Sequence, residues 1–114
     1  MDSLLRLLMG PWTTHILWIL SSQGPLRFGV LKREVAGISS KVLTDRLRML
    51  EAAGVIYRDY KPSVPPAVTY GMTARGEELN QVLDALSEIS QRWDKEEQAA
   101  RAGSSFETGA NPSP

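Results

Sequence analysis

GISSKVLTDRLRMLEAAG, residues 37–54, is the stretch of sequence that decides the fold. Ser39 is a good N-cap residue, and Gly54 is a residue type that commonly ends a helix. Between them the apolar positions recur at helical spacing: Leu43, Leu47 and Leu50. The pattern predicts a helix from Ser40 to Ala53 that buries one face.

A second, shorter helical pattern precedes this stretch. Residues 27–35 place Phe28, Leu31 and Val35 on one face. The connection, Ala36–Ser39, contains a glycine, as the turns of helix-turn-helix motifs often do. A further helix is expected upstream over Trp12–Ser22, ending at Gly24-Pro25.

After Gly54 the period of the pattern changes from helix to strand. Val55–Tyr60 is β-branched and aromatic, Lys61–Pro66 is a proline-rich turn, and Ala67–Met72 alternates. These features predict a β-hairpin with a loop of about six residues. The fold class is therefore mainly α with a small β-hairpin, and residues 12–72 form a winged helix-turn-helix.

Both ends of this core carry further apolar segments. Ser3–Met9 is apolar at nearly every position, broken only by Arg6, which predicts burial, for instance against a second subunit, so residues 1–9 are expected to form a dimerisation helix. A long helix is expected over residues 74–97, capped by Thr73. Residues 98–114 are rich in Gly, Ser, Pro and Ala and are expected to form a disordered tail.

Composition excludes several function classes. The 114 residues include no Cys and one His, so a disulfide, a thiolate zinc site and a cysteine nucleophile are ruled out. There is no glycine-rich phosphate loop and no recognisable catalytic constellation, so an enzyme is not expected, and no cofactor or metal is expected either. No apolar run approaches the roughly 18 residues of a membrane span, and a cytoplasmic location is expected.

The charge is balanced overall but divided along the chain. Residues 1–75 contain ten Lys or Arg against five Asp or Glu, whereas residues 76–114 contain three against eight. A basic first part within a neutral chain is compatible with a local nucleic-acid footprint.

The outward side of the 40–53 helix carries the side chains suited to reading DNA. At 100° per residue, four polar residues fall opposite the leucines: Lys41, Thr44, Asp45 and Arg48. Lys and Arg favour guanine and phosphate, and Thr can contact a thymine methyl. Ser39 and Ser40 lie where backbone N–H groups can receive a phosphate. Arg46 lies nearer the apolar stripe, and its head is expected to reach a phosphate or a carboxylate.

Other basic residues extend this surface. Arg58 and Lys61 flank the Pro62–Pro66 tip of the hairpin, where they could meet phosphate or the minor groove, and Arg27 and Lys32 could reach flanking phosphates. Ordinary solvated surfaces would also account for the helix face and the charged hairpin.

Several linked motifs resemble the HxlR-type winged-helix transcriptional regulators, in order from about Leu4 to Trp93. They are Gly10–Thr13, Gly24–Phe28, Gly37–Thr44, Arg46–Arg48, Leu50-Glu51, Ala53–Ile56, Val64–Pro66, Val68–Tyr70 and Thr73–Gly76. The resemblance implies a bacterial or archaeal cytoplasmic homodimer that binds double-stranded DNA. It also implies that the first and last helices form the dimer interface. The expected interface residues are Leu4, Leu5, Leu8, Leu79, Leu83, Leu86, Ile89 and Trp93.

Two departures from the family pattern matter. Many relatives carry a cysteine upstream of the Gly-x-Trp motif, and some use it as a sensor, but this chain has none. Thiol sensing is therefore not expected. Gly71 and Met72 stand where Ser and Leu are typical, and Gly71 is expected to loosen the end of the hairpin.

The sequence thus predicts a dimeric regulator, a repressor rather than an activator, on a pseudo-palindromic operator. One alternative is a winged-helix protein-interaction module that does not bind DNA. Another is a regulator gated by a small aromatic ligand in a pocket at the dimer interface around Trp12 and Trp18.

Overall fold

The structure is a computed structural model that describes the backbone of residues 2–110 and the side chains of residues 3–103. It divides into two units, the first ending at Leu83 and the second beginning at Asp84. The helices are α1 (Asp2–Met9), α2 (Thr13–Gln23), α3 (Phe28–Glu34), α4 (Ser40–Ala52), α5 (Ala74–Glu77) and α6 (Asn80–Ala110). The strands are β1 (Leu26–Arg27), β2 (Ile56–Lys61) and β3 (Ala67–Met72).

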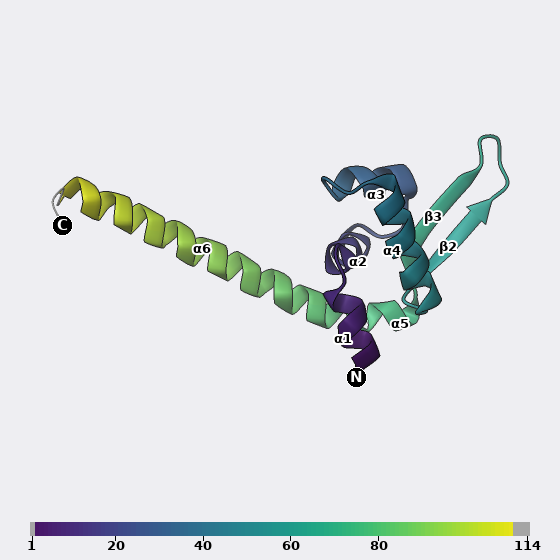
Figure 1. Cartoon of the computed structure of the whole chain (residues 1–114), viewed down its shortest axis with the longest axis horizontal. Coiled ribbons are helices and arrows are strands. Elements are labelled where there is room, and N and C mark those ends of the chain that lie inside the picture. Colours follow the sequence, from purple (N-terminus) through teal and green to yellow (C-terminus); the bar gives the residue numbers. More distant parts are fainter. Residues whose placement is uncertain (1, 111–114) are drawn as a thin grey trace. The chain divides into compact units, whose positions relative to one another are not determined.

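The first unit is a winged helix-turn-helix, as the sequence predicts (Figure 1). Helices α2, α3 and α4 surround a core to which α2 contributes Ile16, Leu17 and Leu20. Helix α4 contributes Leu43, Leu47 and Leu50, each at most 1% exposed. The predicted leucine stripe is therefore confirmed as the buried side of α4.

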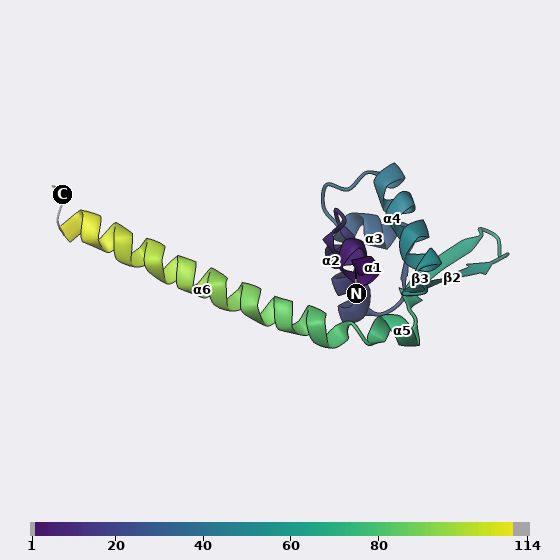
Figure 2. The same ribbon diagram turned by 60° about the horizontal axis from the view of Figure 1, so that its bottom comes forward.

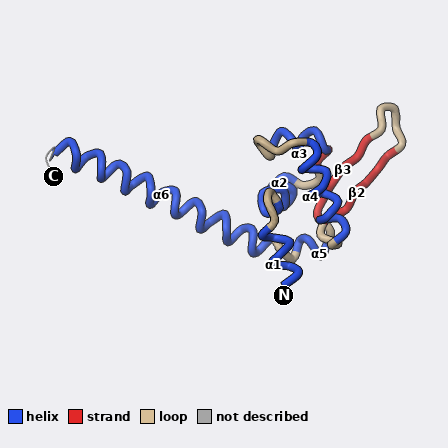
Figure 3. The backbone as a smooth tube through the Cα atoms, viewed as in Figure 1, coloured by secondary structure: helices blue, strands red, loops and turns tan. Residues whose placement is uncertain are grey.

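The wing is an antiparallel hairpin that extends away from the helices (Figures 1 and 2). Strands β2 and β3 pair from Ile56 opposite Met72 to Lys61 opposite Ala67. Strand β1 is not predicted by the sequence; it pairs with β3 and makes a three-stranded sheet in the order β1-β3-β2. Figure 3 shows the two longer strands, β2 and β3, in red. A two-residue strand is too short to show alternation, so only the folded sheet reveals it.

Gly71 is closely covered by a side chain of the neighbouring strand, and the expectation that it loosens the hairpin stays a prediction. It lies directly opposite Tyr57 in the register, and a Cβ atom at this position would overlap the Tyr57 ring. The tyrosine therefore covers the glycine backbone, and Gly71 is itself buried. The glycine makes room for an aromatic contact between the two strands.

The last helix also differs from its prediction. A short turn at residues 78–79 separates α5 from α6, with the N–H of Leu79 donating to the carbonyl of Gly76 at 2.9 Å. In the structure α6 continues through residues 98–110, of which residues 98–102 are strong helix formers, and the disordered tail stays a prediction. An ion pair of 4.0 Å between Glu97 and Arg101 also supports the helix. Residues 111–114 of the expected tail lie outside the described residues.

None of the helices formed by residues 2–110 is both long and apolar enough to cross a bilayer.

Candidate nucleic-acid interface

Helix α4 presents two contrasting sides. Its leucine side is buried, whereas Lys41, Asp45 and Arg48 on the other side are exposed. Among the described side chains the only ion pair is that of Glu97 with Arg101. Lys41, Asp45 and Arg48 therefore have no ionic partner among those side chains. Asp45 and Arg48 accordingly do not neutralise each other. The outward charges are available to an external partner.

The start of α4 is capped by Ser39 and exposed to solvent. The Ser39 hydroxyl accepts a hydrogen bond of 3.1 Å from the N–H of Val42, which confirms the predicted N-cap. The first N–H groups of a helix have no partner within it, and those of Ser40 and Lys41 point out of its N-terminal end. Ser39 and Ser40 are both exposed. An anion such as a phosphate suits this end of the helix.

Thr44 is half-buried and its hydroxyl is already used. The hydroxyl donates a hydrogen bond of 2.8 Å to the carbonyl oxygen of Ser40, one turn earlier. This internal bond leaves the methyl group as the part of Thr44 best suited to a base, where a thymine methyl would be its apolar partner.

Arg46 does not join the outward surface. Its Nη1 lies 3.8 Å from the Sδ of Met49, and a Cβ atom added to Gly10 would lie 3.2 Å from the same nitrogen. The side chain is half-buried, and its Nε is buried without a hydrogen-bond partner among the described residues. Its head lies beside the junction of α1 and α2, and its expected contact with a phosphate or a carboxylate stays a prediction.

The two wing candidates lie on opposite faces of the hairpin. Arg58 and Lys61 are both exposed, but they are three residues apart on β2, and strand side chains alternate. Arg58 shares the face of the buried Ile56, with its guanidinium carbon 5.7 Å from the centroid of the Tyr60 ring. That distance is within the range of a cation–π interaction. Arg58 is thereby restrained by Tyr60, whereas Lys61 is not.

Two wing residues were missed by the sequence interpretation. Tyr60 is 50% exposed, and Val64 at the tip of the hairpin is fully exposed. An apolar side chain that projects from a wing has no partner of its own, and apolar side chains are used by proteins that enter the minor groove. The sequence feature that could have indicated Val64 is an apolar residue between Ser63 and Pro65 in the expected turn.

The remaining predicted residues are placed as follows. Arg27, in β1, and Lys32, in the last turn of α3, are exposed. Trp12 packs beside Gly37 in the turn before α4, and Trp18 packs against the core. The ligand pocket expected around Trp12 and Trp18 stays a prediction.

The predicted dimer residues fall into two groups. Leu79 and Leu83 are buried in the core of the first unit and have little surface left to give to a partner. Leu8 is half-buried and packs against that core, and Ile89 is half-buried in the second unit. The remaining four are exposed by 40–59%: Leu4, Leu5, Leu86 and Trp93.

Comparison with known proteins identifies relatives of this arrangement. The family model described as HxlR-like helix-turn-helix matches residues 7–98. An uncharacterized HTH-type transcriptional regulator of Synechocystis sp. is 42% identical over 91 residues, 80% of this chain and 67% of that protein. An uncharacterized HTH-type transcriptional regulator of Halalkalibacterium halodurans is 38% identical over 84 residues, 74% of each chain.

Solved structures are similar as well. A MarR-family transcriptional regulator from Porphyromonas gingivalis W83 superposes with a TM-score of 0.75 at 32% identity, over 79% of this chain and 87% of that one. The redox regulator HypR in its reduced form gives a TM-score of 0.77 at 26% identity, over 86% of this chain and 96% of that one. Each of these proteins shares the winged-helix architecture described above.

Proposed function

Because the chain belongs to the HxlR-like helix-turn-helix family and is a transcriptional regulator of that type, we propose that it binds a pseudo-palindromic operator as a homodimer. The observation that carries this proposal is the two-sided character of α4. One side consists of buried leucines, and the other exposes Lys41 and Arg48 without ionic partners in the described chain. These two residues are seven positions apart, about 10 Å along the helix axis, which matches about three base steps in a major groove.

Base contacts and phosphate contacts are divided between the elements. We assign Lys41, Thr44 and Arg48 to the major groove, with Asp45 able to accept from a cytosine amino group. Lys61, Arg58, Arg27 and Lys32 are assigned to phosphates beside that groove, together with the N-terminal end of α4. Such contacts release counterions, so the affinity falls steeply as salt rises.

The exposed apolar side chains at the two ends of the chain support the homodimer. Leu4 and Leu5 on α1, and Leu86 and Trp93 on α6, are large and 40–59% exposed. Burying them against a second copy would remove this apolar surface from water. A two-fold dimer would also present two copies of α4, which is how a symmetric protein reads two half-sites.

Repression is the simplest outcome of such binding, because a dimer bound over a promoter blocks access to it. Relief of repression would not use a thiol, since the 114 residues contain no cysteine. In this respect the chain differs from HypR, which is named as a redox regulator. The protein-interaction alternative is less well supported, because an interface centre is usually apolar and the outward side of α4 is charged.

Selection of binding sites from random duplex DNA tests this proposal directly. The account predicts enrichment of two inverted half-sites with their centres about one helical turn, roughly 34 Å, apart. Enrichment of a single asymmetric half-site would contradict the symmetric dimer. Absence of any enriched sequence would contradict specific DNA recognition.

A further inference from the structure

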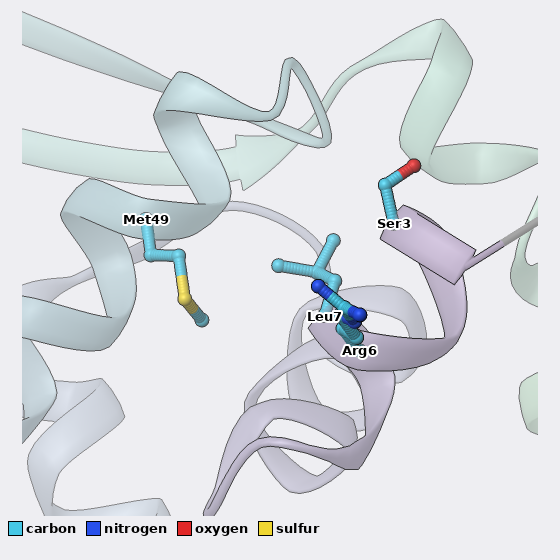
Figure 4. A pocket seen from close by; sticks show the side chains of 4 residues that line it. All are labelled: Ser3, Arg6, Leu7 and Met49. Atoms are coloured by element: carbon cyan, nitrogen blue, oxygen red, sulfur yellow. The ribbon is translucent and has the colours of Figure 1, made fainter.

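A hollow lies between α1 and the C-terminal half of α4. It has a volume of about 500 Å³ and is lined by Ser3, Arg6, Leu7 and Met49 (Figure 4). The figure shows the Leu7 side chain extending from α1 toward Met49 on α4, with Arg6 beside it on α1.

A second hollow of about 280 Å³ adjoins the first, because Ser3, Leu7 and Met49 line both. It extends the floor with Ala53 and Val55, reaches Arg75 of α5, and includes Leu4, one of the residues proposed above for the dimer interface. The combined groove therefore has an apolar floor and two guanidinium groups on its lining, those of Arg6 and Arg75. Neither hollow is lined by an Asp or a Glu.

Two arginines, Arg6 and Arg75, line the groove. Both are exposed, and neither takes part in an ion pair among the described side chains. Arg75 lies over the end of α4, with its Nη1 3.8 Å from where a Cβ atom on Gly54 would be. Arginine presents planar donors that match a carboxylate in a bidentate manner.

We propose that this groove binds a small amphipathic carboxylate, a molecule with an apolar body of about one aromatic ring and a single carboxylate. The ring would lie on Leu7, Met49 and Val55, and the carboxylate would be held by Arg6 or Arg75. A neutral molecule of the same shape would leave both guanidiniums without a partner. The groove is distinct from the surroundings of Trp12 and Trp18, neither of which lines it.

The position of the groove gives such a ligand a route to the DNA-reading surface. Met49, on its floor, is the neighbour of Arg48 in α4 and contacts the Arg46 guanidinium at 3.8 Å. A ligand that draws α1 and α4 together would shift the helix that carries Lys41 and Arg48. This effector role rests on the proposed DNA binding, whereas the ligand site itself does not. Coupling of the two sites is reciprocal, so DNA would change the affinity for the ligand by the same factor.

The test uses the full chain and 4-(trifluoromethyl)benzoate as the probe, followed by ¹⁹F NMR. We expect saturable binding with a dissociation constant below about 1 mM, and at least about tenfold weaker binding of the neutral 4-(trifluoromethyl)benzyl alcohol. The double variant Arg6→Gln/Arg75→Gln is expected to bind the benzoate at least about tenfold more weakly. Arg33→Gln removes an equally exposed arginine on α3 and is expected to leave binding unchanged.

A second variant tests the location of the ligand site without changing the charge of the groove. Ser3→Phe puts a ring into the hollow at an exposed position of α1, and we expect it to abolish binding of the benzoate while circular dichroism shows an intact fold. Equal binding of the benzoate and the alcohol would overturn the proposal. Benzoate binding that survives the double variant and Ser3→Phe would overturn it as well, as would the absence of saturable binding.

The effector role is judged separately, by the affinity of the wild-type chain for its selected DNA with and without the probe. A change in DNA affinity that Ser3→Phe removes supports it. Unchanged DNA affinity at saturating probe overturns the effector role and leaves the ligand site standing. Failure of the wild-type chain to bind any DNA contradicts the proposed function alone, because the NMR result does not depend on DNA.

Discussion

The backbone of Gly76 lies directly against the carbonyl oxygen of Val55, with no room for a Cβ atom between them. Thr73 links the same two residues by hydrogen bonds. Its N–H donates to the Val55 carbonyl at 3.0 Å, and its Oγ1 accepts from the N–H of Gly76 at 3.0 Å. The Thr73 hydroxyl in turn donates to the carbonyl of Gly54 at 2.6 Å. These bonds fix the start of α5 against the base of the wing.

Gly76→Ala is therefore expected to destabilise the fold by about 2 kcal/mol or more, because the added methyl must push backbone apart. Urea denaturation followed by circular dichroism measures the loss. Gly29→Ala is the matched control, since nothing lies within 4 Å of its added Cβ atom and it lies inside α3. We expect that control to be neutral or slightly stabilising. Equal effects of the two substitutions would contradict the close contact.

Arg48→Ala is expected to weaken binding to the selected operator by about 1–3 kcal/mol and to relax the sequence preference at one position. The reason is loss of a bidentate contact to a base edge. Competition binding against single-base operator variants measures both effects. Arg33→Ala, an exposed arginine in the last turn of α3, serves as the control and should leave the preference intact. An unchanged preference in Arg48→Ala would remove Arg48 from base recognition.

Thr44 allows a finer test, because its hydroxyl is bonded to the Ser40 carbonyl. Thr44→Val keeps a methyl and should bind the operator within about threefold of the wild type, whereas Thr44→Ser, which lacks the methyl, should lose about 1 kcal/mol at a thymine position. Binding isotherms on the operator and on its thymine-to-uracil version give the comparison. A larger loss of operator affinity in Thr44→Val than in Thr44→Ser would show that the hydroxyl, not the methyl, contacts the base.

Much of this surface could be predicted from sequence, because its signals are local. The leucine spacing of α4, the Ser39 cap and the change of period at Gly54 each belong to one segment. Arg46 could not be placed, since its contacts with Met49 and beside Gly10 depend on where α1 packs. The break between α5 and α6 was also hidden, because Glu78 and Leu79 are ordinary helix formers and the cause lies in the packing of Gly76.

The two wing cations are expected to differ. Lys61→Ala should weaken binding to every DNA sequence alike and reduce the slope of log affinity against log salt by about 1, as loss of one phosphate contact does.

Tyr60→Leu should reduce the affinity for DNA through Arg58, because the cation–π contact at 5.7 Å no longer restrains the guanidinium. Salt titrations of both variants provide the slopes. A loss confined to the operator in Lys61→Ala would contradict a phosphate role.

The dimer proposal has its own test. Leu5→Glu and Trp93→Glu each place a charge on an exposed apolar position and are expected to shift the chain to monomer in sedimentation velocity. Val64→Glu is the control, because Val64 is fully exposed at the tip of the wing. Its sedimentation should match the wild type. Dimers that persist in both interface variants would place the interface elsewhere.

The central claim, that the outward side of α4 recognises an operator, is tested most directly by fluorescence anisotropy on the selected operator across a salt series, with random DNA as competitor. The account predicts binding of two chains per site that survives the competitor in the wild type and is lost to it in the variant Lys41→Ala/Arg48→Ala. It also predicts that this variant keeps weak, salt-dependent binding to random DNA. Equal resistance to competitor in the wild type and the variant would contradict the claim.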